Sequence, residues 1–373
     1  MDTERDSSVA LRNGDVEHLV NAAAKYGVYG LGRMLQKRFA LLVMADIHRC
    51  AGALRRATSY LDMMDALDAG ICLGDMQGSN FAENDGAWYL DVIRGTTKRF
   101  FTVIGNHDGG QGNDRDVCGT KQQVFDKFIK PVREQMQLPK LSKTYYCVNF
   151  DQYKITMIVL DNYDVPDDSD EHHFLINRET EMISQEQADW LQSVLMNVPK
   201  DYHVIVARHS ITEACVPIES DWTQSEFQIQ DVEHGCVTGN LVTDLIDAWI
   251  HGKSIHRKYC SEEFSQIPPV VLDVDYSKRG QGNFVAYLVG HSHVDWHGVC
   301  EKYPEQNVII FPSSADDDWQ NLYSDLPRLL GTKAQDCFTV FTVDTQERMI
   351  CLVRVGSNIT YRMVERTATT IKY

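Results

Sequence analysis

Residues 100–108 read F-F-T-V-I-G-N-H-D, and this stretch decides the fold because an apolar run ends abruptly in a polar cluster. A short apolar run bounded by glycine is typical of a buried strand. The tetrapeptide G-N-H-D at 105–108 is expected by chance only about 0.003 times in a chain of this composition. We therefore predict a buried strand that delivers an asparagine, a histidine and an aspartate to one edge of a sheet.

The same arrangement of a strand followed by polar residues recurs along the chain. Further apolar, strand-like runs lie at 39–45, 70–74, 155–160, 204–207 and 284–289. Four of these five runs lead into polar residues of the same kind, namely Asp46-Ile47-His48, Asp75, Arg208-His209 and Gly290-His291-Ser292-His293. G-H-x-H is expected by chance about 0.03 times, whereas D-x-H is common enough that only its place after a strand selects 46–48.

These polar residues form the mixed nitrogen and oxygen set that divalent transition metals prefer. In open α/β sheets, ligands bind outside the carboxyl ends of the strands, where several chain segments converge. A helical pattern from Leu54 to Leu67 separates the first two runs and makes a parallel βαβ unit plausible. The sequence therefore predicts an α/β protein with a metal site at one rim of its sheet.

The series D-x-H, G-D, G-N-H-D, a lone histidine after a strand and then G-H-x-H resembles the calcineurin-like metallophosphoesterases. The resemblance covers roughly residues 39–315 and includes L-D-N at 160–162 and Q-A-D-W-L at 187–191. It implies a four-layer α/β/β/α sandwich of two mixed sheets, the metallophosphoesterase fold. It also implies a dinuclear metal site.

The resemblance assigns a role to each motif residue. It implies that the first metal is held by Asp46, His48 and His293, that the second is held by Asn106, His209 and His291, and that Asp75 bridges both. His107 matches the catalytic histidine of the family, and Asp108 would orient it. Two departures matter: the family often continues the lone histidine as H-x-P where this chain has His209-Ser210-Ile211, and Gly78 replaces the tyrosine of purple acid phosphatases.

The implied cofactors are two divalent metal ions, of which manganese, iron and zinc are the candidates. Such a pair lowers the pKa of a bound water and clamps the phosphoryl oxygens, so that a metal-bound hydroxide serves as the nucleophile. An imidazole, with a reference pKa of about 6.5, suits proton donation to the leaving group near neutral pH. Arg49 and Ser210 flank ligand residues and are candidate contacts for the substrate phosphate.

The composition and charge of the chain restrict its expected partners and its expected location in the cell. The chain has 373 residues and a formal net charge of −17, which argues against broad nucleic-acid binding. No apolar run approaches the roughly 20 residues needed to span a bilayer, so no membrane partner is expected. The start, M-D-T-E-R-D, shows no signal peptide, and the ten cysteines form no C-x-x-C pair. We therefore expect a cytoplasmic protein with reduced thiols.

The chain divides into an extension and one main domain. Residues 1–38 predict an N-terminal helical extension, and 39–373 the metallophosphoesterase domain. The 80 residues between His209 and Gly290 exceed what a strand connection needs, so we interpret 211–283 as a cap-like insertion near the metal rim. The last apolar runs predict an antiparallel meander of Val308–Phe311, Phe338–Val343 and Met349–Val355.

The sequence thus predicts a metal-dependent phosphoester hydrolase that acts on a small molecule. Two alternatives remain at this point: a nuclease on the same fold, and a non-catalytic metal-binding scaffold. The net charge counts against the nuclease, and the presence of His107 with the whole ligand set counts against the scaffold. The choice between monoester and diester, the native metals and the oligomeric state stay open.

Overall fold

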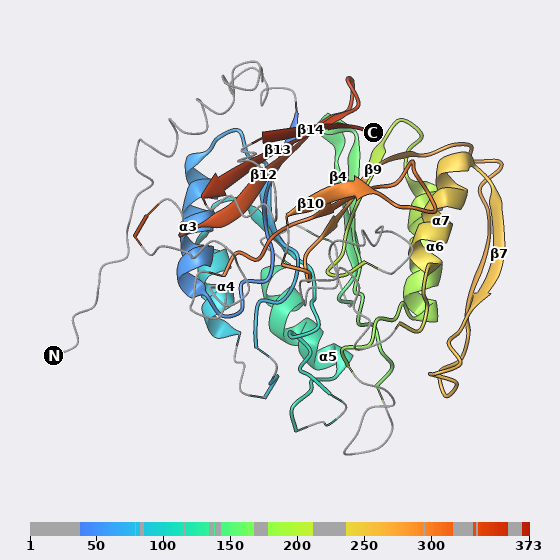
Figure 1. Cartoon of the computed structure of the whole chain (residues 1–373), viewed down its shortest axis with the longest axis horizontal. Coiled ribbons are helices and arrows are strands. Elements are labelled where there is room, and N and C mark those ends of the chain that lie inside the picture. Colours follow the sequence, from blue (N-terminus) through green and yellow to red (C-terminus); the bar gives the residue numbers. More distant parts are fainter. Residues whose placement is uncertain are drawn as a thin grey trace, which may run out of the picture.

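The computed structural model describes residues 38–78, 80–82, 86–112, 114, 116–133, 138, 143–167, 178–211, 236–293, 295–315, 331–332, 335–356 and 368–373. These residues form two six-stranded sheets that lie between two layers of helices (Figure 1). Among them there is no helix with the length and apolar character that crossing a bilayer requires. The cytoplasmic location stays a prediction of the sequence.

The first sheet is mixed and has the strand order β14-β13-β12-β1-β2-β3. Its strands are β1 (Phe39–Met44), β2 (Ala69–Cys72), β3 (Arg99–Thr102), β12 (Cys337–Asp344), β13 (Met349–Gly356) and β14 (Ala368–Lys372). The first three run parallel, and β12, β13 and β14 pair antiparallel beside them. Helices α3 (Ala51–Met63) and α4 (Ala87–Gly95) connect the parallel strands and cover the outer face of this sheet (Figure 1).

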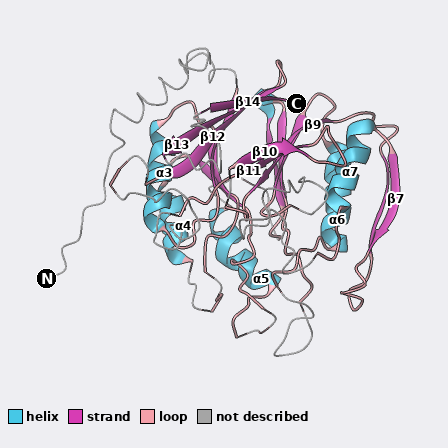
Figure 2. Cartoon of the chain, viewed as in Figure 1, coloured by secondary structure: helices cyan, strands magenta, loops and turns pink. Residues whose placement is uncertain are grey.

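The second sheet is also mixed and has the order β10-β11-β9-β6-β5-β4. Its strands are β4 (Tyr146–Phe150), β5 (Ile155–Val159), β6 (His203–Ala207), β9 (Asn283–Val289), β10 (Trp296–Val299) and β11 (Asn307–Ile310). The inner four are parallel, and the edge strands β4 and β10 are antiparallel. Helices α6 (Gln185–Asn197) and α7 (Leu241–His251) cover its outer face (Figure 2).

The smaller elements lie in the connections. A hairpin of β7 (Ser254–Tyr259) and β8 (Val270–Asp275) lies outside α6 and α7. The segment between β3 and β4 contains the short helix α5 (Lys121–Val124), the π-helical turn Phe125–Ile129 and the 3-10 turn Lys130–Val132, and a second 3-10 turn, Asp151–Tyr153, joins β4 to β5. Thr120 caps α5 by accepting a hydrogen bond from the amide of Gln123.

Alternating side chains of β5 show how the layers are stacked. Met157 and Val159 belong to the core that includes the first sheet, whereas Ile158 belongs to the core beneath α6 and α7. Since successive side chains of a strand point to opposite faces, the second sheet lies between the first sheet and these helices. The predicted four-layer α/β/β/α sandwich is therefore confirmed.

The predicted strands are present, with one correction at the end of the chain. All six early runs appear as β1, β2, β3, β5, β6 and β9, and β1 pairs parallel with β2 as the βαβ pattern predicts. The predicted meander is wrong in its first member, because β11 pairs parallel with β9 in the second sheet. Only β12 and β13 form the expected antiparallel hairpin.

The predicted insertion falls into two parts. Residues 236–283 supply α7 and the β7–β8 hairpin, which pack on α6 in the outermost layer. Residues 212–235, with Trp222 and Phe227, lie outside the described residues, and so do residues 1–37 of the predicted extension. That 211–283 forms a cap-like insertion near the metal rim stays a prediction.

The buried carboxylate of Asp244 on α7 ties the outer layer together. It accepts hydrogen bonds from Arg257 at 2.6 Å, the Tyr259 hydroxyl at 2.8 Å and Lys302 at 3.0 Å. The Tyr303 hydroxyl is a fourth donor. We expect Asp244→Ala to lower the free energy of unfolding by about 2–4 kcal/mol, because hydrogen bonds to charged groups are the strong ones. Urea unfolding measures this, with Asp247→Ala on the same helix as the control; equal losses in both variants would contradict it.

Candidate metal centre

Several of the predicted site residues, all of which follow strand ends, share an unusual backbone conformation. Six of the eight non-glycine residues with positive φ in the described part of the chain lie here: Asp46, His48, Arg49, Asp75, His291 and His293. Such conformations cost roughly 1–2 kcal/mol for residues with a side chain. They persist where surrounding contacts enforce them, and they concentrate at functional sites.

Hydrogen bonds between loops enforce this conformation. The amide of Asp46 donates to the Gly74 carbonyl at 3.1 Å, and the amide of His48 donates to the Asp75 carbonyl at 3.0 Å. The loop after β9 joins them, because the amide of His291 donates to both oxygens of the Asp46 carboxylate at 3.1 Å. The loops after β1 and β2 are therefore joined through their main chains, and the loop after β9 is joined to them through the Asp46 side chain.

The glycines of the motifs let these loops approach closely. A Cβ atom at Gly105 would lie 2.2 Å from Oδ1 of Asp75. A Cβ atom at Gly74, which has a φ of 101°, would lie 2.3 Å from Nδ1 of His209. Any side chain at either position would displace a predicted ligand, and this explains why G-D and G-N-H-D begin with glycine.

The first predicted ligand group comes together around two facing imidazoles. Nε2 of His48 lies 3.2 Å from Nε2 of His293, and Nε2 of His293 lies 3.5 Å from Oδ1 of Asp46. All three side chains are less than an eighth exposed. Their ligand atoms lie within 4.8 Å of one another, close enough to bind one ion.

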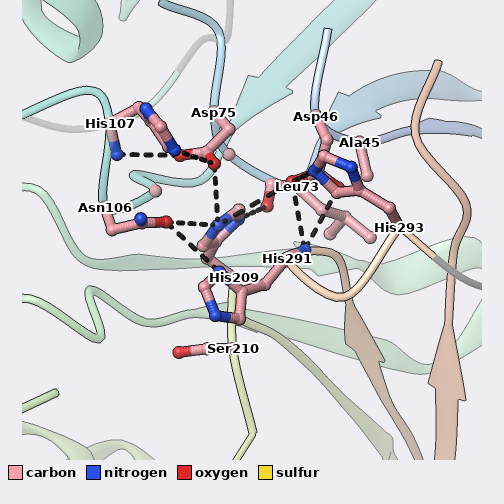
Figure 3. Close-up of polar contacts among 12 residues, drawn as sticks. Ala45, Asp46, Leu73, Asp75, Asn106, His107, His209, Ser210, His291 and His293 are labelled. Carbon is pink, nitrogen blue, oxygen red and sulfur yellow. Dashed lines mark hydrogen bonds and ion pairs between the residues drawn. The ribbon is translucent and has the colours of Figure 1, made fainter. Parts of the chain in front are cut away.

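The second group lies on the other side of Asp75. Oδ1 of Asn106 lies 3.1 Å from Nε2 of His209 and 3.2 Å from Nδ1 of His291. Oδ2 of Asp75 lies 3.4 Å from Nε2 of His209 and 3.9 Å from Nε2 of His48. The Asp75 carboxylate thus faces a histidine from each group, and Figure 3 shows it beside His209.

The charge of the centre suits cations. Burial would raise the pKa of Asp75, yet the histidines around it hold that pKa well below the usual range. Burial lowers the pKa of His48 to about 4 and that of His291 to about 3, so both imidazoles are neutral with a lone pair available. For His209, burial is outweighed by the Asp75 and Asp46 carboxylates, and the pKa rises to about 10. Two buried carboxylates with several imidazoles and one amide oxygen fit divalent metal ions.

A backbone carbonyl fixes the orientation of the His209 ring. Nδ1 of His209 lies 2.6 Å from the carbonyl oxygen of Leu73, and that oxygen can only accept a hydrogen bond. Nδ1 therefore carries the proton, which leaves Nε2 to face Asp75 and Asn106. Metal-binding histidines are commonly oriented in this way by a carbonyl or a carboxylate.

His107 lies beside the two groups and is more open to solvent than His209. Its amide donates to Oδ1 of Asp75 at 2.9 Å, and Nε2 of its ring lies 3.7 Å from Oδ2 of the same carboxylate. Its side chain is 21% exposed, whereas that of His209 is 0% exposed. A substrate can therefore reach the His107 ring from solvent, whereas it cannot reach the buried His209 ring.

The Asp108 carboxylate is held by backbone amides. Among the described residues, the donors to its buried carboxylate are the amides of Met76 at 2.9 Å, Gln77 at 3.1 Å and Gly105 at 2.9 Å. It therefore fastens the loop after β3 to the loop after β2, and none of these three contacts involves the His107 ring. Burial, with the nearby charge of Asp75, raises the pKa of Asp108 to about 8.

The two predicted phosphate contacts differ in accessibility. Arg49 is exposed, and its guanidinium lies beside Gly78, where an added Cβ atom would be 3.5 Å from Nε. Ser210 is 1% exposed, and its hydroxyl lies 3.2 Å from the hydroxyl of Tyr163. Arg49 can therefore meet a substrate from solvent, whereas Ser210 lies beneath the surface.

The remaining histidines do not join the cluster in the described part of the chain. His203 begins β6, at the end remote from the site, and its Nδ1 lies 3.0 Å from the Tyr373 hydroxyl. His297 lies in β10 beyond the loop that carries His291 and His293. His172 and His173 lie outside the described residues.

Sequence reasoning missed the residues that position the ligands. Leu73 orients His209 through its carbonyl group, which no side-chain pattern encodes. Asn162 accepts a hydrogen bond from the amide of His209 at 3.1 Å. The sequence did carry a signal for Asn162, because it follows a strand in L-D-N just as Asn106 follows β3.

One family model and several solved structures match the chain. A family model described as calcineurin-like phosphoesterase matches residues 39–295. A structure entitled "Structure of PhoD" is 11% identical, with 90% of this chain and 70% of that chain covered and a TM-score of 0.47. A purple acid phosphatase from yellow lupin (Lupinus luteus) seeds is 13% identical, with 90% and 54% covered and a TM-score of 0.43.

A third solved structure, the phosphopantetheinyl hydrolase of Mycobacterium tuberculosis, is 13% identical, with 79% of this chain and 97% of that chain covered and a TM-score of 0.40. No curated protein sequence matches the chain. The family model spans more than half of the chain and includes every predicted metal ligand. The chain therefore belongs to the calcineurin-like phosphoesterase family and is a phosphoric ester hydrolase.

Proposed function

We propose that this hydrolase uses two divalent metal ions, bridged by Asp75, to cleave phosphoesters of small molecules. The observation that carries the proposal is the position of the Asp75 carboxylate, with Nε2 of His209 at 3.4 Å and Nε2 of His48 at 3.9 Å. These two histidines belong to different ligand groups. A carboxylate in that position can ligate both ions and reduce their mutual repulsion.

Each ion would have its own set of protein ligands. Asp46, His48 and His293 would hold one, and Asn106, His209 and His291 would hold the other. When bound, such a pair supplies Lewis acidity for the phosphoryl oxygens and a nucleophile derived from water. The mixed nitrogen and oxygen donors suit manganese, iron or zinc.

The chain's own residues would serve the leaving group. The ring of His107 lies at the edge of the cluster and is partly exposed, so it can reach the leaving oxygen of a bound ester. There it would donate a proton or stabilise the developing negative charge. The exposed Arg49 would contact the non-reacting phosphate oxygens through a charge-assisted hydrogen bond.

A small substrate agrees with the charge of the protein. The formal net charge of −17 opposes the approach of a long polyanion, whereas a single phosphoester can be attracted by local cations. The complete ligand set with His107 supports a working enzyme over a binding scaffold. Monoesters and diesters both remain candidate substrates.

Metal removal and reconstitution test the proposal. We expect protein stripped by a chelator to leave 4-nitrophenyl phosphate and bis(4-nitrophenyl) phosphate intact, and added Mn²⁺, Fe²⁺ or Zn²⁺ to restore hydrolysis of at least one of them. A panel of phosphomonoesters, phosphodiesters, nucleotides and single-stranded DNA then identifies the substrate class. Hydrolysis that persists unchanged in chelator would contradict the proposal, and a clear preference for DNA would favour the nuclease.

A further inference from the structure

Behind His209 lies a buried polar chain that belongs to neither ligand group. It consists of Asn162, Glu181 and Arg208, whose exposed fractions are 1%, 4% and 2%. Oδ1 of Asn162 accepts a hydrogen bond from the amide of His209 at 3.1 Å, and Nδ2 of Asn162 donates to Oε2 of Glu181 at 3.4 Å. The same Glu181 oxygen lies 3.4 Å from Nη2 of Arg208.

The Asn162 side chain replaces a strand carbonyl as hydrogen-bond acceptor where the pairing of β5 and β6 ends. Strands β5 and β6 pair in register as far as Val159 and Ala207, and the amide of Leu160 still donates to the Ala207 carbonyl at 2.9 Å. The next amide on this side, that of His209, donates to the side chain of Asn162 and not to a strand carbonyl. This side chain therefore sets the path of the main chain at the ligand itself.

Glu181 determines which way the Asn162 amide faces. A carboxylate can only accept hydrogen bonds, so the NH₂ end of Asn162 must point to Glu181 and the oxygen must point to the His209 amide. Reversing the amide would place two donors against each other at His209 and two acceptors against each other at Glu181. Arg208 in turn neutralises the buried carboxylate, since a buried charge without a partner is costly.

The position of His209 matters to the whole second ligand group. Its main-chain oxygen accepts a hydrogen bond at 2.8 Å from the amide of Gly290, the residue before His291. Its Nε2 lies 3.1 Å from Oδ1 of Asn106. A shift of the His209 main chain would therefore disturb His291 and Asn106 as well, while Asp46 and His48, two of the three ligands of the other group, lie on the separate loop after β1.

We propose that Asn162, held by Glu181 and Arg208, is a positioning residue for His209 and sets the metal affinity of the group formed by Asn106, His209 and His291. This rests on the proposed function, in which that group binds one of two ions. Loss of such an outer hydrogen-bond partner typically weakens metal binding about 10–100-fold. The other group should keep its affinity.

Mn²⁺ binding to the full chain, followed by titration calorimetry and by competition with a chelator, tests the proposal. We expect Asn162→Ala to weaken one of two Mn²⁺ sites by about 10–100-fold and to leave the other within about threefold of the unaltered protein. The matched control is Asn307→Ala, which likewise removes a buried asparagine; Asn307 donates to the Val285 carbonyl and lies away from the site. It should leave both sites unchanged.

A second variant separates positioning from stability. Asn162→Asp retains an oxygen for the His209 amide but places a carboxylate against Glu181. We therefore expect it to unfold more easily than the unaltered protein. We also expect it to bind Mn²⁺ at the group of Asn106, His209 and His291 more tightly than Asn162→Ala does. Affinities that follow the order of the unfolding midpoints, or two unchanged sites in Asn162→Ala, would overturn the positioning role alone. A single Mn²⁺ site in the unaltered protein would overturn the proposed function, and this inference with it.

Discussion

Asp75→Asn is expected to abolish the paired metal site while leaving the fold intact. The asparagine has the same shape, and its oxygen can still accept the hydrogen bond that Oδ1 of Asp75 now accepts from the His107 amide at 2.9 Å. What disappears is the negative charge that lies between His48, His107 and His209. Without that charge, two adjacent cations repel each other with no shared ligand to compensate.

The loss of metal affinity should exceed the roughly 10–100-fold that removal of an outer hydrogen-bond partner costs. Elemental analysis after dialysis at a fixed Mn²⁺ concentration measures it. A matched control is Asp161→Asn, because Asp161 is equally buried but bonds to Thr144 and the Tyr163 amide, outside both ligand groups. Two retained ions per chain in Asp75→Asn would refute the bridging role.

His107→Ala is expected to keep both metals and to lose about 10²–10⁴ in kcat, the usual contribution of a general acid or base. The geometry leaves two roles open, because the ring nitrogen of His107 lies within 4.8 Å of ligand atoms of both His48 and Asp75. The variant separates them, since a ligand would take a metal with it and a proton donor would not. His256→Ala, at an exposed position on β7, is the control.

Comparing two esters with different leaving groups distinguishes the possible roles of His107. If His107 protonates the leaving oxygen, its loss should matter less for a 4-nitrophenyl ester, whose leaving group is already stable as an anion, than for an alkyl ester. Equal losses with both esters would show that His107 does not act on the leaving oxygen. Loss of a metal ion in His107→Ala, with kcat restored by excess metal, would instead make His107 a ligand.

The sequence predicted the central strands and the residues at their ends because both depend on local patterns. Strands such as β1 and β6 are continuous apolar runs, and a parallel sheet buried on both faces requires such runs. Their carboxyl ends meet at one rim, so the polar residue after each strand could be assigned to a common site. The structure brings Asp46, Asp75, His209 and His291 together as that reasoning expects.

What the sequence could not predict depends on contacts between distant segments. The β7–β8 hairpin was missed because S-I-H-R-K-Y has little apolar alternation, and this strand is held through Arg257 and Tyr259 on Asp244. β11 was placed in the wrong sheet because an apolar run does not reveal its partner strand. Asp108 follows His107 directly, yet its carboxylate turns to backbone amides of another loop.

The most direct test of the account is a crystal structure of the protein grown with Mn²⁺, with anomalous scattering used to locate the metal. The account predicts two adjacent anomalous peaks about 3.5–4 Å apart, the separation typical of two-metal sites, with the Asp75 carboxylate contacting both. One peak should contact Asp46, His48 and His293, and the other Asn106, His209 and His291. A single peak at saturating Mn²⁺, or two peaks without Asp75 between them, would contradict it.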